Sequence, residues 1–164
     1  MTTIEKRIIN ILTVALIIIG LTTVYLVAHP ENAQRKFATP AFEENVVEGY
    51  PKIDVDAFHF QTAKISEDYS ASICGKPEIE NNSQINLYFT SPSNNKVWLR
   101  YIIYDSQGEE LGGSGIIKPG EYLKSSKLNR ELENEETIIV KVISHEPNTY
   151  YSCGSVNLQI KIEK

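Results

Sequence analysis

The feature that most constrains this chain is an uncharged stretch near its N-terminus. Residues 8–28 hold no charged side chain over 21 positions and are rich in Leu, Ile and Val. A helix rises about 1.5 Å per residue, so this stretch would extend for about 31 Å, close to the roughly 30 Å core of a bilayer. We therefore predict one transmembrane helix at residues 8–28, with membrane lipid as its partner.

The charges beside this stretch predict its orientation. Lys6 and Arg7 immediately precede it, and basic residues beside a span tend to stay in the cytoplasm. We therefore expect residues 1–7 to be a cytoplasmic head and the rest of the chain to lie outside. The alternative is a cleaved signal peptide, but its apolar core is usually about 7–15 residues long. Leu26 also stands where a cleavage site needs a small residue, so we favour an uncleaved anchor.

Residues 29–52 are predicted to be a linker. They contain Pro30, Pro40 and Pro51 and show no sustained periodicity, which is typical of loops. A flexible coil of 24 residues has an r.m.s. length of about 27 Å. The domain that follows is therefore expected to lie close to the outer surface of the membrane that the helix crosses.

Residues 53–164 are predicted to form an extracytoplasmic antiparallel β-sandwich of immunoglobulin-like type, with about seven strands. Short segments in which apolar and polar residues alternate are separated by turns rich in Gly, Pro and Asn. One or two helical turns are expected at residues 127–133, where Leu128 and Leu132 would share a face. The number and spacing of the strands favour an all-β sandwich. The expected strands are residues 57–65, 72–76, 85–90, 97–104, 110–117, 122–126, 137–145 and 156–162.

Composition and motifs argue against several classes of function. The chain has 16 basic and 21 acidic residues, and residues 29–164 alone carry a net charge of −6. An acidic domain without a basic stripe is a poor binder of nucleic acid. No clustered metal ligands, phosphate-binding loop or nucleophile motif is visible. We therefore expect no nucleic-acid partner, no metal, no cofactor and no catalytic residue, which indicates a protein that is not an enzyme.

Cys74 and Cys153 are the only cysteines, and both fall on the predicted outer side of the membrane. Cysteines in an oxidising compartment usually pair. A disulfide here would close a loop of about 80 residues and stabilise the fold by up to about 4.5 kcal/mol in the chain-entropy model. We predict that disulfide. The alternatives are unpaired thiols or a cysteine nucleophile with His59 or His145 as its base, but nothing local would lower a thiol pKa.

The expected strand at residues 97–104 has large apolar and aromatic residues on both of its sides. If Val97, Leu99, Tyr101 and Ile103 face the core, the other side of the strand presents residue types that are enriched at binding hot spots. This side is our candidate partner face, and it consists of Trp98, Arg100, Ile102 and Tyr104. The alternative is a central strand that the linker or a long loop covers on that side.

Several segments resemble the outer domains of small single-pass exported proteins of Gram-positive bacteria, which are often carried on mobile genetic elements. The matching segments are residues 87–95 (LYFTSPSNN), residues 114–120 (SGIIKPG), Leu128, Leu132 and residues 156–162 (VNLQIKI). The resemblance covers residues 85–164. It implies an immunoglobulin-like sandwich, and most such proteins have no assigned activity, so no catalytic residue is transferred.

These observations together predict a non-enzymatic, membrane-anchored extracytoplasmic protein. We expect an accessory or structural component of a cell-envelope assembly, such as a conjugation, secretion or adhesion apparatus, that acts through protein–protein contacts. One alternative is a pilin-like filament subunit, because residues 2–5 (TTIE) resemble the start of mature pilin-like proteins; Lys6 and Arg7 would then be buried in the filament. Another alternative is a binding module for a wall polymer or a small ligand.

Overall fold

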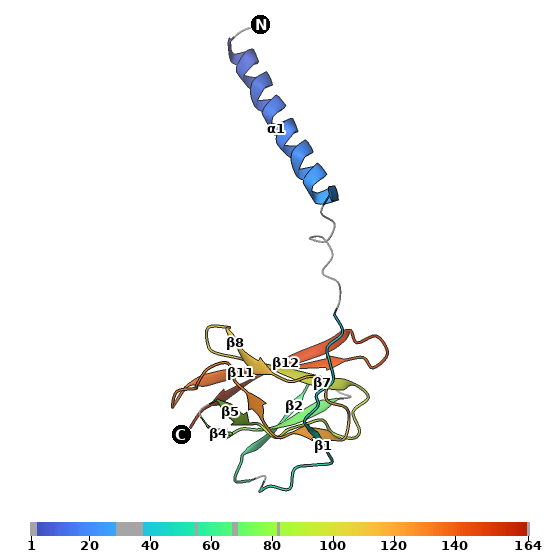
Figure 1. Ribbon diagram of the computed structural model, residues 1–164, viewed down its shortest axis with the longest axis vertical. Coiled ribbons are helices and arrows are strands. Elements are labelled where there is room, and N and C mark those ends of the chain that lie inside the picture. The colour runs from blue at the N-terminus through green and yellow to red at the C-terminus, as the bar shows by residue number, and fades with distance from the viewer. Residues whose placement is uncertain (1–2, 29–37, 55, 67–68, 82, 164) are drawn as a thin grey trace. The chain divides into compact units, whose positions relative to one another are not determined.

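The computed structural model describes residues 3–28, 38–54, 56–66, 69–81 and 83–163. The chain divides into two compact units, Met1–Ala38 and Thr39–Lys164. The first unit contains the helix α1 (Thr3–Ala28), and the second contains every strand that the structure describes (Figure 1). The second unit is called the β-domain below.

Helix α1 includes the whole of the uncharged stretch. It is 26 residues long, and the Thr22 hydroxyl donates back to the Ile18 and Ile19 carbonyls at 3.0 and 2.9 Å. The side chains of residues 11–20 are exposed. Over the residues that the structure describes, no helix is long and apolar enough to cross a membrane. The predicted transmembrane helix is therefore not confirmed.

The β-domain is built from antiparallel sheets, as predicted. Figure 1 shows two layers, with β8, β11 and β12 in one and β1 and β2 in the other. In strand order, the four-stranded sheet consists of β12 (Ser152–Lys161), β11 (Thr137–His145), β7 (Trp98–Tyr104) and β8 (Glu110–Gly113). The five-stranded sheet consists of β1 (Val46–Glu48), β9 (Glu121–Leu123), β6 (Phe89–Thr90), β3 (Ser70–Cys74) and β2 (Phe60–Lys64).

A small third sheet lies beside the two layers. It consists of β10 (Ser126–Lys127), β5 (Gln84–Asn86) and β4 (Glu78–Glu80). Strand β10 contacts β8, whereas β12 contacts β2 on the other side of the domain. The described residues thus form twelve strands rather than about seven, because several of the expected strands are divided into segments of two or three residues.

The core lies between the inner sides of the two layers. Burial alternates along the whole of β7 and along β11 as far as Ser144, so that Leu99, Tyr101 and Ile103 of β7 are fully buried while their neighbours are half-buried. Tyr101 packs against Phe89 of the opposite sheet with ring centroids 4.7 Å apart, and its hydroxyl is hydrogen-bonded to the Ser126 hydroxyl. Burial raises the pKa of Tyr101 far above its ordinary value, so this phenol stays neutral.

The β-domain begins earlier than the predicted boundary at residue 53. The compact unit starts at Thr39, and residues 46–48 form β1, which pairs with β9. Upstream of β1, the Ile116 amide donates to the Ala41 carbonyl at 2.8 Å, and the Glu43 amide donates to the Ile116 carbonyl at 2.9 Å. Much of the predicted linker is therefore part of the domain. Residues 29–37 lie outside the described residues.

Two local expectations are corrected by the structure. The expected strand 85–90 is interrupted at Tyr88, which has a positive φ of 45°. The expected helical turns at residues 127–133 do not form. Leu128 and Leu132 are both buried, but the Leu128 amide donates to the Ser83 carbonyl rather than within a helix. Neighbouring strands therefore take the hydrogen bonds that a helix would have kept local.

An ion-pair network, rather than a helix, fixes the position of the segment around residues 127–133. Arg130 forms ion pairs with Glu136 and Asp105, and Asp105 also accepts hydrogen bonds from the backbone amides of Glu109 and Gln107. The Glu109 amide is the main cause of the lowered pKa of Asp105, and the hydrogen bond from Arg130 is the main cause of the lowered pKa of Glu136. The network ties the β7–β8 turn to the segment that precedes β11.

This network predicts acid-sensitive stability. Carboxyl groups with a lowered folded pKa stabilise the fold above their unfolded values of about 4, and that contribution is lost as the pH falls through the lower folded values. We expect Arg130→Gln to lower the free energy of unfolding by up to about 1 kcal/mol at pH 7, since the Arg130 side chain is 40% exposed. The deficit should shrink below about pH 4. Thermal melts from pH 7 to pH 3 measure this, and a deficit that is constant with pH would contradict it.

Candidate interaction surface

The side of the four-stranded sheet that points away from the core carries a group of half-buried side chains. Register places Arg100 opposite Ile143, Ile102 opposite Lys141, and Tyr104 opposite Ile139. Because residues that pair in an antiparallel sheet share a face, these side chains form one surface. We call it the outer face, defined by Arg100, Ile102 and Tyr104 of β7 and by Ile139, Lys141 and Ile143 of β11.

The outer face combines apolar residues with cations. All six of its side chains are half-buried. Within the described part of the chain, neither Arg100 nor Lys141 forms an ion pair, and the Tyr104 hydroxyl has no hydrogen-bond partner. Two acidic residues lie near this face without forming an ion pair with it: Glu110 is opposite Tyr104 on β8, and the Glu43 carboxylate accepts from the Gly115 amide beside β7. The outer face is therefore an apolar surface with two cations that the domain itself leaves without a counter-ion.

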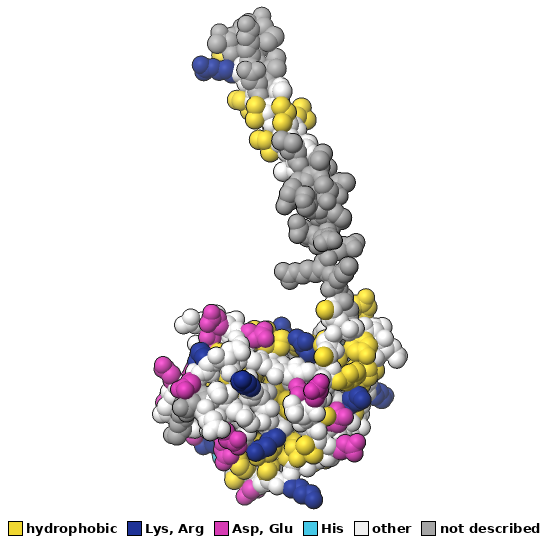
Figure 2. Space-filling model, viewed as in Figure 1, with side chains coloured by type: hydrophobic (Ala, Val, Ile, Leu, Met, Phe, Trp, Pro, Cys, Tyr) yellow, Lys and Arg dark blue, Asp and Glu magenta, His cyan; other side chains and the backbone are white. Residues whose placement is uncertain are grey.

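Trp98 belongs to the same side of β7, but it is covered. Its ring packs against Phe42 and Tyr150, with centroids 4.9 and 5.1 Å apart and edge-on geometry in both contacts. Phe42 and Tyr150 also contact each other at 6.3 Å, and the Lys118 ammonium lies 4.8 Å from the centre of the Phe42 ring. Phe42, Trp98 and Tyr150 are called the aromatic corner below. In Figure 2, apolar side chains gather where the chain enters the β-domain.

A short backbone segment holds the aromatic corner in place. Residues 41–43, called the strap, form a parallel bridge with Ile116, which itself lies next to Ile117, the bridge partner of Leu99 on β7. The Gly115 amide adds a hydrogen bond to the Glu43 carboxylate at 2.9 Å. The strap thus extends the four-stranded sheet and brings Phe42 onto Trp98. Phe42 itself remains 40% exposed.

The same side of the sheet contains two buried nitrogen atoms without a hydrogen-bond partner in the described part of the chain. They are Arg100 Nε and His145 Nε2, and His145 lies opposite Trp98. His145 Nδ1 lies 2.8 Å from the Tyr150 carbonyl. Because a carbonyl only accepts, Nδ1 carries the proton, and Nε2 of the neutral ring is an acceptor. A buried polar group without a partner costs about 1–3 kcal/mol. Both atoms lie beneath the surface, so this is a cost to the fold rather than a contact point for a partner.

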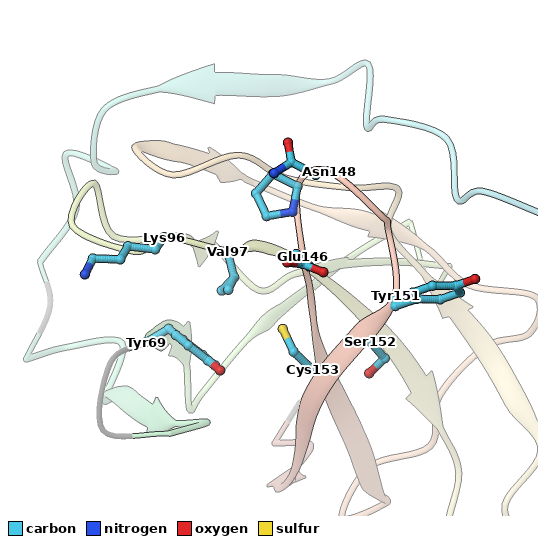
Figure 3. A pocket seen from close by; sticks show the side chains of 9 residues that line it. Tyr69, Lys96, Val97, Glu146, Asn148, Tyr151, Ser152 and Cys153 are labelled. Carbon is cyan, nitrogen blue, oxygen red and sulfur yellow. The ribbon is translucent and has the colours of Figure 1, made fainter.

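A separate cleft opens at the end of the domain near Cys153. Its volume is about 570 Å³, and it is lined by Tyr69, Lys96, Val97, Glu146, Pro147, Asn148, Tyr151, Ser152 and Cys153. In Figure 3, Cys153 lies at the centre, while Lys96 and Tyr151 extend to opposite sides. The Cys153 thiol lies 3.4 Å from the Ser144 hydroxyl, to which it donates. No histidine lines this cleft.

The predicted disulfide is not supported, because both cysteines are free. Cys74 is the last residue of β3, whereas Cys153 shares its cleft with Tyr69, which immediately precedes that strand. Five residues of strand extend for about 16 Å, whereas a disulfide needs Cα atoms within about 7 Å of each other. The Cys74 thiol instead donates to the Phe58 carbonyl at 3.3 Å.

The two thiols should react at different rates. Cys153 is exposed, whereas Cys74 is fully buried, and burial is the main cause of its raised pKa. In native, unreduced protein we expect a maleimide to label Cys153 on the order of 100-fold or more faster than Cys74. Mass spectrometry before and after unfolding measures both rates. If unreduced protein showed no reactive thiol even when unfolded, the two cysteines would be paired after all.

Among the described residues, no group of three or more His, Cys, Asp or Glu side chains is arranged to hold a metal ion. The expectation of no cofactor and no catalytic residue stays a prediction. The structure places the four residues of the candidate partner face on one side of β7, as the alternation predicts. The structure separates Trp98, which Phe42 and Tyr150 cover, from the other three.

Half of the residues of the outer face were not predicted from the sequence. Ile139, Lys141 and Ile143 of β11 contribute as many side chains as β7 does. The burial of this strand alternates in the structure, but its sequence (TIIVKVISH) is nearly all apolar, so the pattern alone did not indicate which side faces outward. Phe42 carried no signal either, since its contact with Trp98 depends on a bridge to Ile116 that no local pattern indicates.

The chain was compared with protein-family models, with curated proteins and with solved structures, and no match was found in any of the three. The resemblance to small exported proteins of Gram-positive bacteria therefore stays a prediction.

Proposed function

We propose that this chain is a non-enzymatic, membrane-anchored protein whose β-domain lies outside the cell and binds another protein through the outer face. The observation that carries the proposal is the composition of that face. Arg100, Tyr104 and three isoleucines are half-buried and adjacent on a rigid sheet, and Arg and Tyr are enriched among residues that dominate binding energy. Such a protein would serve as an accessory or structural component of a cell-envelope assembly for conjugation, secretion or adhesion.

The anchor is supported by the sequence and by the helix that forms there. Residues 8–28 are uncharged, and α1 includes all of them. The large apolar side chains described on this helix are exposed, Leu16 to 70% and Ile11 to 68%. An apolar helix with such exposure favours a lipid or helical environment. Lys6 and Arg7 favour a cytoplasmic N-terminus. We further propose that the two-layered β-domain is of immunoglobulin-like type, a scaffold that hosts many binding functions.

The partner face is tested by removing side chains that the fold does not need. Tyr104→Ala combined with Ile139→Ala should weaken partner binding at least tenfold in pull-downs of the full chain from its own cells. The matched control is Val47→Ala with Tyr50→Ala, two side chains that are 47% and 56% exposed elsewhere on the domain. Both variants should melt within a few degrees of the parent chain. If a well-folded Tyr104/Ile139 variant kept its partner, the outer face would not be the binding surface.

A second candidate function is a module for a wall polymer or a small ligand. The observation that favours it is the cleft near Cys153, which sets Tyr69 and Tyr151 beside Asn148 and Glu146. Aromatic rings with a few polar groups are typical of small-ligand sites. Calorimetric titration with soluble wall fragments tests this candidate. Binding that Asn148→Ala weakens, and that Tyr104→Ala leaves unchanged, would assign the function to the cleft.

A further inference from the structure

The two cations of the outer face lie close to each other. Arg100 is opposite Ile143, and Lys141 lies two residues before Ile143 on β11, so Arg100 and Lys141 are diagonal neighbours. Diagonal neighbours in a sheet lie about 7–8 Å apart, within reach of long side chains. Like charges at this spacing repel each other, and an anion bound between them would remove that repulsion.

Four of the eleven described basic residues of the β-domain have an acidic partner, and the other seven, Arg100 and Lys141 among them, have none. Ion pairs join Lys76 to Glu163, Lys124 to Glu80, Lys161 to Glu135, and Arg130 to Asp105 and Glu136. In the described part of the chain, Arg100 and Lys141 have none, and Arg100 Nε is buried without a hydrogen bond. Because Nε is buried, only the terminal guanidinium nitrogens of the half-buried Arg100 can reach a carboxylate, and two of them can bind it with parallel hydrogen bonds.

The surroundings of the two cations indicate what kind of anion fits. Ile102, Tyr104, Ile139 and Ile143 flank them and offer apolar contact. A protein segment that carries an acidic residue between apolar residues would use both parts of this surface. A polyanion such as a phosphate-rich polymer would leave the apolar part unused.

We propose that the partner presents an acidic segment to the outer face, with an Asp or Glu carboxylate bound between Arg100 and Lys141. Apolar side chains of the same segment pack on Ile102, Ile139 and Ile143. This inference rests on the proposed function and specifies the chemistry of its partner.

The test uses a photo-crosslinking amino acid, benzoylphenylalanine, placed at Tyr104 of the full chain in its own cells. We expect one protein product, and the peptide mapped by mass spectrometry should contain Asp or Glu within a few residues of the crosslink. Arg100→Gln and Lys141→Gln together should lower the yield at least tenfold. Arg100→Met, which keeps the apolar stem, should lower it as well. The matched control is Lys64→Gln, which removes an exposed lysine of β2 on the other sheet and should leave the yield unchanged.

The possible outcomes separate the two proposals. A protein product whose mapped peptide lacks acidic residues, with a yield that is indifferent to Arg100, overturns the acidic partner and leaves the proposed function standing. The absence of any protein product overturns both. A product that consists of multiples of this chain identifies a second copy as the occupant. A product that resists protease and is degraded by wall hydrolases identifies a polymer. Either of these last two results rejects the inference.

Discussion

Tyr101→Ala is expected to lower the free energy of unfolding by about 3–5 kcal/mol, the range found when a large aromatic residue is removed from a packed core. Tyr101 is fully buried at the centre of β7, and its ring contacts Phe89 of the opposite layer. Its hydroxyl is bound to Ser126, the first residue of β10. One side chain therefore connects all three sheets. Typical domains have only about 5–15 kcal/mol of stability in total, so this change removes a large part of it.

Chemical denaturation of the full chain, followed by the fluorescence of the single tryptophan, measures this loss. Tyr101→Phe is the matched control because it keeps the ring and removes only the hydroxyl. It should cost about 1–2 kcal/mol, the value of one buried hydrogen bond. If Tyr101→Ala cost no more than Tyr101→Phe, the ring would not pack between the layers as described.

Gly115→Ala is expected to detach the strap and expose the aromatic corner. A Cβ atom at residue 115 would lie 2.6 Å from the Glu43 nitrogen, 2.8 Å from the Phe42 carbonyl carbon and 2.9 Å from the Ala41 oxygen. All three are backbone atoms, which cannot move aside as a flexible side chain can. The strap would lose three hydrogen bonds, and we expect stability to fall by about 2–4 kcal/mol.

The fluorescence of Trp98 reports this change directly, because the Phe42 side chain would no longer pack against the indole ring. We expect a red-shifted emission in Gly115→Ala together with a lower melting temperature. Gly154→Ala is the matched control: a Cβ there would meet only side-chain atoms of Ile65 and Ser144, at an ordinary distance of 3.4 Å. An unshifted emission in a folded Gly115→Ala variant would show that the strap does not hold Phe42 against Trp98.

The features that could be predicted from the sequence are those with a local period. The alternation along residues 97–104 predicts which side chains of β7 face the core, and the structure confirms it. The last strand behaves in the same way, since Val156 and Leu158 are half-buried and Ile160 and Ile162 are buried. Alternation with a period of two follows from the pleat of a single strand. It can therefore be predicted without knowing which strands pair with it.

The features that could not be predicted depend on contacts between distant residues. The strap falls in a Pro-containing stretch that has no period of its own, and its bridge to Ile116 supplies the order. Whether Cys74 and Cys153 can pair likewise depends on which end of β3 each residue lies near, and they lie near opposite ends. Leu128 and Leu132 are both buried, as predicted. Two buried residues four positions apart do not require a helix, however, when the backbone between them forms hydrogen bonds with other parts of the domain.

The central claim is that a partner covers the outer face of an exported domain, and cysteine accessibility in intact cells tests it most directly. Tyr104→Cys and Val47→Cys would be made separately in a Cys153→Ser background and labelled with a membrane-impermeant maleimide. We expect the Val47→Cys variant to react equally fast in cells and after purification, since Val47 lies on another sheet and is 47% exposed. The Tyr104→Cys variant should react at least fivefold more slowly in cells than after purification. Equal rates for Tyr104→Cys in the two settings, or no labelling of either variant in intact cells, would contradict the account.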